Sequence, residues 1–429
     1  MAGRRRRGTS FGTVFMILLT VAVLGSSAFV LMRLSRGHTV DLSGLQAQVV
    51  SLGTDGPAGM KPPDAEAPAT PETRAPAATQ QATAAPSAPL EKRRTVLTFG
   101  GTVAVEDQVR RSGYAADTKK YDFSDSFMLI RPEIQGSVSG VFFENLLMDD
   151  TKVSATVIPA VGAAALKAAG FSCAFAGFSR AWEKNETGIQ STIRILRDSG
   201  ITPLGLAETE QDTVYAVRDA DGIRVALMQY TATVSANTRK AMQKRNGNHM
   251  IPEADPAEIA KDIADARNAG AEIVVVLLNW GKVGSRNPDK AQLALAQEIA
   301  ESGADLIIGA GSRVPQRVEP LLTADGRQVL CAYSLGTLIS DSRKNSQRMS
   351  SYLLHVELTA EPDQKPEITG VTYTPTYVWK YRQDSKDYYR VVPSDRSAPD
   401  GMDSDQIRQM QKALTTVRET LESGPASIR

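Results

Sequence analysis

Residues 95–393 alternate short apolar runs that favour β-strands with amphipathic stretches that favour helices, and this alternation restricts the possible folds more than any other feature of the sequence. It is typical of α/β domains, in which helices cover the faces of layered sheets. The predicted strands are residues 96–99, 140–143, 173–176, 225–230, 273–278, 305–308 and 329–333. The predicted helices are residues 187–199, 255–269 and 288–302.

A further helix is predicted over residues 403–424, inside a C-terminal segment that we delimit at 394–429. Its apolar residues recur every three or four positions and form one face: Ile407, Met410, Leu414, Val417 and Leu421. The pattern is short for a coiled coil, which favours docking on the domain's own surface over dimerisation. Both interpretations stay open.

The first residues of the chain predict a membrane anchor. Residues 11–32 contain no charged side chain, and ~22 apolar residues suffice for a helix that spans a bilayer. Residues 4–7 are all arginine, and such a cluster stays on the cytoplasmic side. We therefore predict a cytoplasmic basic tail (1–10), a single transmembrane helix (11–32) and an extracytoplasmic bulk, hence localisation in the cell membrane. A cleaved signal peptide, with small residues at 26–28, is the alternative.

Residues 33–94 are predicted to form an extracytoplasmic linker rich in Pro and Ala. Between residues 53 and 90, Ala, Pro, Thr, Gln and Ser dominate, and this composition cannot bury a core. We expect the linker to be disordered and the folded domain to begin at residue 95.

Charge and cysteine content exclude some functions. Lys plus Arg (49) nearly balances Asp plus Glu (48), and part of the clustered positive charge lies in the first few residues, so nucleic acid is not expected as a partner. The two cysteines, Cys173 and Cys331, each lie in an apolar run, which favours two buried thiols. A single bridge between them is the alternative.

Loops that follow strands carry function in α/β domains, so the residues just after each predicted strand are the candidates for chemistry. Gly100-Gly101-Thr102 follows the first strand, Glu144-Asn145 the second and Gly177-Phe178-Ser179-Arg180 the third. Further along come Asn279-Trp280-Gly281, the segment 309–316, and Tyr333-Ser334-Leu335-Gly336.

The order and spacing of these motifs resemble the CapA family of poly-γ-glutamate capsule proteins, whose domain is similar to calcineurin-like metallophosphoesterases. The positions that match the family pattern include Gly101, Asn145, Leu146, Gly188, Trp280, Gly281, Gly309, Val314, Gln316 and the segment 333–336. The resemblance covers most of residues 95–393. It implies a layered, metallophosphoesterase-like β-sandwich flanked by helices. It also implies an anionic envelope polymer, or the proteins that synthesise and export it, as partner.

The metal ligands that the resemblance implies are missing. Where the family has acids and histidines, this sequence has Thr102, Leu147, Phe178-Ser179-Arg180, Asn279, Ala310 or Gly311, and Arg313. The three histidines of the chain, His38, His249 and His355, lie elsewhere. A dinuclear site needs carboxylate and imidazole donors that converge on two cations, so we expect no metal or other cofactor.

Arginine at two of these positions suggests instead that an anion binds in the old metal cavity, because a guanidinium is permanently charged. The predicted ligand-binding residues are Thr102, Asn145, Ser179, Arg180, Asn279, Trp280, Arg313 and Ser334. In the alternative interpretation, each arginine lies along the surface or pairs with a nearby glutamate such as Glu183.

Three functions follow from these observations. The first is a CapA-like protein without metal-dependent catalysis that binds an anionic envelope polymer or scaffolds its export. The second is a metal-dependent hydrolase or transferase with a rewired, oxygen-only ligand set, for which Glu106, Asp107, Glu144, Asp149, Asp150 and Glu183 are the remaining acids. The third is a structural partner that uses the C-terminal helix and the Trp280 surface.

Overall fold

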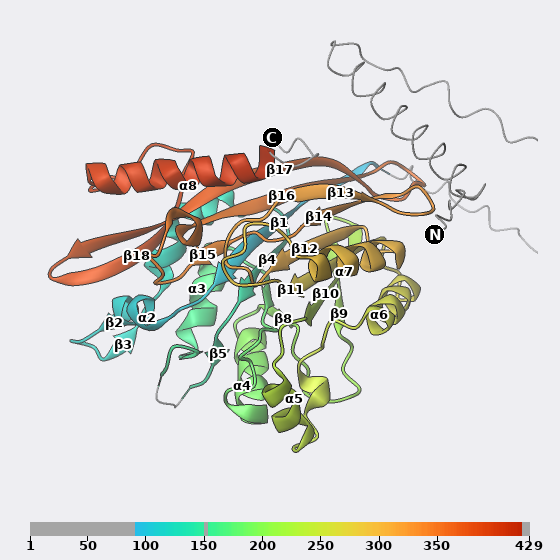
Figure 1. Ribbon diagram of the computed structural model, residues 1–429, viewed down its shortest axis with the longest axis horizontal. Coiled ribbons are helices and arrows are strands. Elements are labelled where there is room, and N and C mark those ends of the chain that lie inside the picture. Colours follow the sequence, from blue (N-terminus) through green and yellow to red (C-terminus); the bar gives the residue numbers. More distant parts are fainter. Residues whose placement is uncertain (1–90, 150–152, 423–429) are drawn as a thin grey trace, which may run out of the picture. The chain divides into compact units, whose positions relative to one another are not determined.

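The computed structural model describes residues 91–149 and 153–422. Two β-sheets of mixed strand direction pack face to face, and helices cover their outer faces (Figure 1). The larger sheet has the order β18-β17-β16-β1-β4-β7-β8, with β15 paired to β1. Its strands are β1 (Arg93–Val103), β4 (Val138–Phe143), β7 (Cys173–Phe175), β8 (Thr202–Leu204), β15 (Thr337–Ile339), β16 (Ser350–Ala360), β17 (Glu367–Gln383) and β18 (Lys386–Pro393).

The smaller sheet has the order β13-β14-β12-β11-β10-β9. Its strands are β9 (Tyr215–Ala220), β10 (Ile223–Thr231), β11 (Ile273–Asn279), β12 (Leu306–Ala310), β13 (Val318–Leu322) and β14 (Gln328–Ala332). The predicted α/β class is confirmed, and each predicted strand overlaps an observed one.

The main core lies between the two sheets. Leu97 and Phe99 of β1 meet Leu227 of β10, Val275 of β11 and Ile308 of β12, all fully buried. Strands β10, β11 and β12 are buried on both faces because helices cover the outer side, and this explains their continuous apolar runs. Burial of this apolar surface, at roughly 25 cal/mol per Å², is the main force that holds the sheets together.

Helices complete the two outer layers. The remaining elements are α2 (Asp107–Gly113), α3 (Val161–Ala169), α4 (Asn185–Asp198), α5 (Ala236–Gln243), α6 (Pro256–Asn268), α7 (Lys290–Glu301), the 3₁₀ helices η1 (Ser124–Glu133), η2 (Asn248–Met250) and η3 (Ser346–Met349), and the short strands β2 (Tyr114–Ala115), β3 (Lys120–Tyr121), β5 (Leu146–Leu147) and β6 (Val157–Ile158). Sequence signals fix the starts of α6 and α7. The Asp255 side chain accepts from Ala257 N at 2.9 Å, and Asp289 forms a capping box with Gln292.

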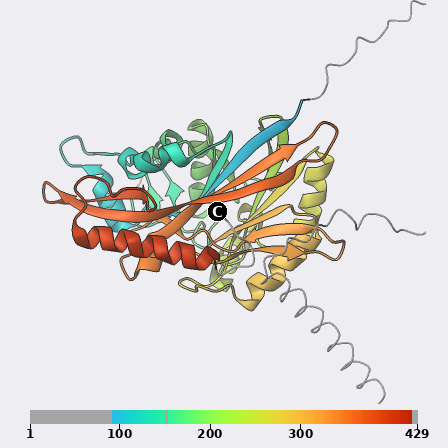
Figure 2. The ribbon, with the colours of Figure 1, turned by 90° about the horizontal axis from the view of Figure 1, so that it is seen from above.

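The last strands and the C-terminal helix form a unit of their own. β16, β17 and β18 make an antiparallel meander, and α8 (Ser404–Glu422) lies along β17 and β16 (Figure 2). Met410 and Ala413 of α8 pack against Tyr377 and Trp379 of β17. A helix therefore occupies the predicted stretch, and in this chain it docks on the domain's own sheet.

Both cysteines are buried and free. Cys173 lies in β7 of the larger sheet, and Cys331 lies in β14 of the smaller sheet. The prediction of two buried thiols is confirmed, and the alternative of a bridge is not realised.

The predicted localisation in the cell membrane is corrected. Within the described part of the chain, residues 91–149 and 153–422, no helix is both long enough and apolar enough to cross a bilayer. The predicted transmembrane helix at residues 11–32, the basic tail before it and most of the predicted linker lie outside the described residues.

Candidate functional site

The candidate site lies where strands of both sheets end at the same edge. β1 and β4 are parallel neighbours in the larger sheet, and β10, β11 and β12 run parallel in the smaller one. The loops after these strands therefore gather at one edge of the sandwich. The Gln229 amide joins the two sheets there: its Nε2 donates to Gly177 O at 2.7 Å, and its Oε1 accepts from Gly177 N at 3.0 Å.

Arg313 lies between two carboxylates at this edge. Its Nη1 donates to Glu106 Oε1 at 2.7 Å, its Nε donates to Glu144 Oε2 at 3.1 Å, and its Nη2 also contacts Glu144. Asn279, at the end of β11, donates to the other oxygen of Glu144 at 3.1 Å and accepts from Thr233 Oγ1 at 3.1 Å. The Glu144 side chain is 9% exposed and that of Arg313 is 23% exposed. This largely buried ion cluster ties loops of the two sheets together.

The cluster shifts the pKa values of nearby groups. Burial alone would lower the pKa of the Arg313 guanidinium, but the charges of Glu144 and Glu106 outweigh burial and raise it. Burial, and to a smaller extent the charge of Arg313, lowers the pKa of Arg348. Burial, followed by a hydrogen bond with Glu106, raises the pKa of Asp341. The site thus holds charges of both signs close together.

The backbone around Arg313 adopts an uncommon conformation. Gly311 (φ +107°) and Arg313 (φ +57°) both lie in the left-handed region. A Cβ atom on residue 311 would lie 2.4 Å from the carbonyl oxygen of Trp280, so only glycine fits there. Thr337 Oγ1 donates to Arg313 O at 2.8 Å and holds the loop in place. A non-glycine residue in this region costs backbone energy, which the surrounding contacts of Arg313 must offset.

Several predicted site residues lie in or beside this cluster. Arg313 and Asn279 are part of it. Asn145 is buried, and its Oδ1 accepts from Val105 N at 2.8 Å, which fixes the residue before Glu106. Trp280 is also buried, with Nε1 donating to Tyr333 O at 2.8 Å.

Ser334 and Thr102 are fully buried near the same edge. Ser334 Oγ accepts from Gly336 N at 3.2 Å, so this side chain holds a turn. Thr102 N donates to Gly336 O at 2.9 Å, but its buried Oγ1 has no hydrogen-bond partner among the described residues.

Ser179 and Arg180 lie in a separate groove, which Trp182 and Glu183 also line. Arg180 Nη2 donates to Glu183 Oε2 at 2.7 Å, and both side chains are partly exposed. This is the pairing with Glu183 that the alternative interpretation describes. The two arginines of the predicted anion pocket therefore have different carboxylate partners.

The donors at this edge do not fit a dinuclear metal centre. Five positions that the resemblance marks as ligands carry neither carboxylate nor imidazole groups, namely Thr102, Leu147, Asn279, Ala310 or Gly311, and Arg313, and the one matching acid is Glu183. Glu106 and Glu144, which could serve as ligands, face a guanidinium instead. Among residues 91–149 and 153–422, no three His, Cys, Asp or Glu side chains gather in a geometry that could hold an ion. No chemistry that requires a metal is therefore assigned to these residues.

Sequence reasoning missed three residues of the site: Thr233, Asp341 and Arg348. Thr233 follows β10, Asp341 follows β15, and Arg348 lies in η3 between β15 and β16. Thr233 follows a predicted strand, so inspection of the residues after strands could have found it, whereas Asp341 and Arg348 follow β15, a strand that was not predicted. Glu106 and Glu144 were recognised as acids near the site but not as partners of Arg313.

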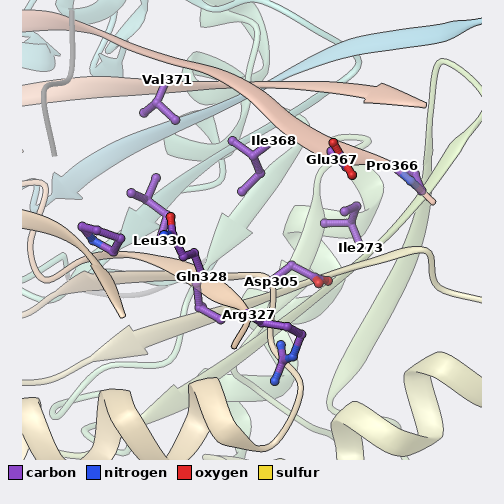
Figure 3. A pocket seen from close by; sticks show the side chains of 11 residues that line it. Ile273, Asp305, Arg327, Gln328, Leu330, Pro366, Glu367, Ile368 and Val371 are labelled. Carbon is purple, nitrogen blue, oxygen red and sulfur yellow. The ribbon is translucent and has the colours of Figure 1, made fainter. Parts of the chain in front are cut away.

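The opposite edge of the sandwich holds a cavity of ≈ 540 Å³ (Figure 3). Its walls include Ile273 at the start of β11, Leu330 of β14 and Ile368 at the start of β17. Two of its polar residues are used by the fold: Asp305 accepts from Val274 N at 2.7 Å, and Arg327 Nη2 donates to Ala300 O at 2.9 Å. Asp305 and Arg327 are therefore not free to bind a ligand in this cavity.

Comparison with known proteins finds relatives that are named for capsule or PGA biosynthesis. The family described as bacterial capsule synthesis protein PGA_cap matches residues 96–342. The capsule biosynthesis protein CapA of Bacillus anthracis is 24% identical over 289 residues, 64% of this chain and 68% of that protein. The PGA biosynthesis protein CapA of Bacillus subtilis is 26% identical over 198 residues, 46% of this chain and 49% of that protein. The match thus spans about half of the Bacillus subtilis protein.

Among solved structures, the calcineurin-like phosphoesterase YfkN from Bacillus subtilis is 11% identical, with a TM-score of 0.40, and the alignment covers 76% of this chain and 99% of that chain. The family assignment rests on the sequence match, which extends from β1 to the loop after β15 and includes Glu106, Glu144 and Arg313. The chain belongs to the bacterial capsule synthesis protein PGA_cap family.

Proposed function

We propose that this protein acts in the synthesis or export of an anionic capsule polymer such as poly-γ-glutamate, and that it binds or scaffolds rather than hydrolysing through a metal centre. The family and the two relatives, whose names refer to capsule and PGA biosynthesis, support the pathway. The absence of metal-dependent catalysis is supported by a single feature, the ion cluster around Arg313.

The cluster supports this function because its donors are already used. Arg313 neutralises Glu106 and Glu144 and connects the two sheets, which is the structural task that a bound cation could otherwise perform. A guanidinium stays charged at any physiological pH, so the connection needs no ion from solution. A metal at this place would have to displace Arg313 from both carboxylates.

The same pairing limits what Arg313 can bind. An anionic ligand at its guanidinium would compete with Glu106 and Glu144, which are held at hydrogen-bond distance. Arg180 is likewise paired, with Glu183. We therefore assign polymer binding to this edge of the domain but not to these two guanidinium groups.

Two measurements test the proposal. Deletion of the gene in its host is expected to lower the amount of capsule polymer, and expression of the chain should restore it. The purified protein is expected to contain no stoichiometric Mn, Fe or Zn and to leave bis(p-nitrophenyl) phosphate intact when Mn²⁺ is added. Stoichiometric metal together with hydrolysis that is abolished by Glu144→Gln would refute the proposal and establish the alternative, a hydrolase with a rewired ligand set.

A further inference from the structure

Two loops beside the Arg313 cluster carry positive charges that the fold does not use. Residues 281–287, after β11, contain Lys282 and Arg286 and no acid. Residues 340–349, between β15 and β16, contain Arg343, Lys344 and Arg348 but only one acid, Asp341. Of these, Arg343 is used by the fold, because its guanidinium lies over the Tyr389 ring. Within residues 91–149 and 153–422, the side chains of Lys282, Arg286 and Arg348 form no hydrogen bond or ion pair.

The two loops are in contact. Gly284 has a left-handed backbone (φ +87°), and a Cβ atom there would lie 3.2 Å from Nη2 of Arg348, so the guanidinium lies directly over the glycine. Gly284 N donates to Ser312 O at 2.7 Å, which attaches this loop to the residue before Arg313. Lys282 and Arg286 each lie two residues from Gly284 along the chain. We group them with Arg348 as the cations of these two touching loops, next to the ion cluster, and call them the basic surface.

Arg348 is a partly buried cation without a direct carboxylate partner among the described residues. Burial and, to a smaller extent, the charge of Arg313 lower its pKa, and the nearby charge of Glu106 offsets only part of this effect. Other arginines of the domain differ: Arg194, Arg239 and Arg245 each have a carboxylate partner in spite of greater exposure. A half-buried cation beside a second cation gains most from an added negative charge.

We infer that the basic surface binds the carboxylate groups of an extended polyanion, with Lys282, Arg286 and Arg348 as the contacting residues. Several cations spread over two loops fit repeated negative groups along a chain better than a single small ion. Guanidinium groups also match the geometry of carboxylates. The choice of poly-γ-glutamate as the ligand rests on the proposed function, whereas the location rests only on the unpaired charges. A polymer of phosphate groups presents the same charge pattern.

Binding measurements with the full chain test this inference. The probes are fluorescently labelled poly-γ-glutamate of defined length, polyphosphate of similar charge, and neutral polyglutamine, at 50, 150 and 500 mM NaCl as approximate settings. The variant Lys282→Ala/Arg286→Ala/Arg348→Ala is compared with Arg194→Ala/Arg239→Ala/Arg245→Ala. The control removes the same net charge from paired surface arginines elsewhere. Circular dichroism and thermal melting confirm that each variant is folded.

The wild type is expected to bind poly-γ-glutamate, and the affinity should fall as salt rises, because bound counterions are released on association. The basic-surface variant should bind about tenfold or more weakly at low salt, and the control within about twofold of wild type. Equal weakening in both variants would overturn the inference, because net charge alone would then explain binding. Tighter binding of polyphosphate than of poly-γ-glutamate would overturn carboxylate recognition.

The outcomes separate this inference from the proposed function. If the wild type binds poly-γ-glutamate and the triple variant binds it equally well, the assignment of binding to the basic surface is refuted, but the proposed binding function is retained. If binding is lost in the variant but the wild type also hydrolyses phosphodiesters with bound metal, the basic surface stands and the proposed non-catalytic function is refuted.

Discussion

Replacement of Arg313 by methionine is expected to destabilise the fold strongly. The variant keeps much of the side-chain volume but removes the charge, and it leaves Glu144 as an ionised group that is only 9% exposed. Glu144 would keep one hydrogen bond, from Asn279 at 3.1 Å. Removal of one partner from a buried ion pair costs about 3–5 kcal/mol, because the other charge stays desolvated.

The magnitude can be measured by urea denaturation and thermal melting. For a domain of this size a loss of 1 kcal/mol lowers the Tm by about 2 °C, so Arg313→Met should melt about 6–10 °C below wild type. Arg180→Met is the matched control, because its partner pair with Glu183 is 59% and 34% exposed. An exposed pair contributes less than about 1 kcal/mol, so the control should melt within about 2 °C of wild type.

A double-mutant cycle completes the test. Glu144→Gln combined with Arg313→Met removes both charges, and we expect it to recover part of the stability that Arg313→Met alone loses. If Arg313→Met destabilises by no more than the Arg180→Met control, the cluster is not an energetically coupled unit. The assignment of Arg313 as the connection between the two sheets would then be refuted.

Three further predictions concern pH and backbone strain. Burial raises the pKa of Asp341, so its charged form lowers stability at pH values above the pKa of this residue in the unfolded chain. Asp341→Asn should therefore raise the Tm at about pH 7, and this gain should vanish as the pH falls below about 4. Burial lowers the pKa of His355, which hydrogen-bonds Thr98 and Thr374. The wild type should therefore lose stability as the pH falls below about 6.5, and His355→Gln should lose less stability between about pH 7 and 5 in the same melts. Gly311→Ala should lower the free energy of unfolding by more than about 1 kcal/mol, and Gly326→Ala should lower it by less. Residue 326 has a positive φ like residue 311, but no atom lies within 4 Å of a new Cβ there. Equal losses for the two variants in urea denaturation would contradict the steric argument.

Sequence patterns predict strands well where both faces are buried. Strands β10 and β11 read as continuous apolar runs because each is covered by the opposite sheet and by helices. β17 was missed, because its first residues are partly exposed and its polar and aromatic side chains alternate without a continuous apolar run. Its burial depends on α8, which follows β18 and packs back on β17, and the pattern within β17 does not contain that information.

The candidate site, like the strands, could be predicted from the sequence only in part. The edge of the sandwich could be predicted, because residues that follow parallel strands share one end of a sheet. The pairing of Arg180 with Glu183 is local and was recognised as an alternative. The partners of Arg313 could not be predicted, since Glu106 and Glu144 are 207 and 169 positions away. Their meeting depends on how the two sheets pack.

Gly311 limits what can be engineered at this edge. The resemblance to the capsule protein family implies a histidine at position 310 or 311. Residue 310 is fully buried in the core between the sheets, and residue 311 is closed to any side chain by the Trp280 carbonyl group. A single substitution to histidine at either position would therefore meet tightly packed atoms. Introduction of a metal ligand into this loop would require a change in the backbone around Trp280 as well as a new side chain.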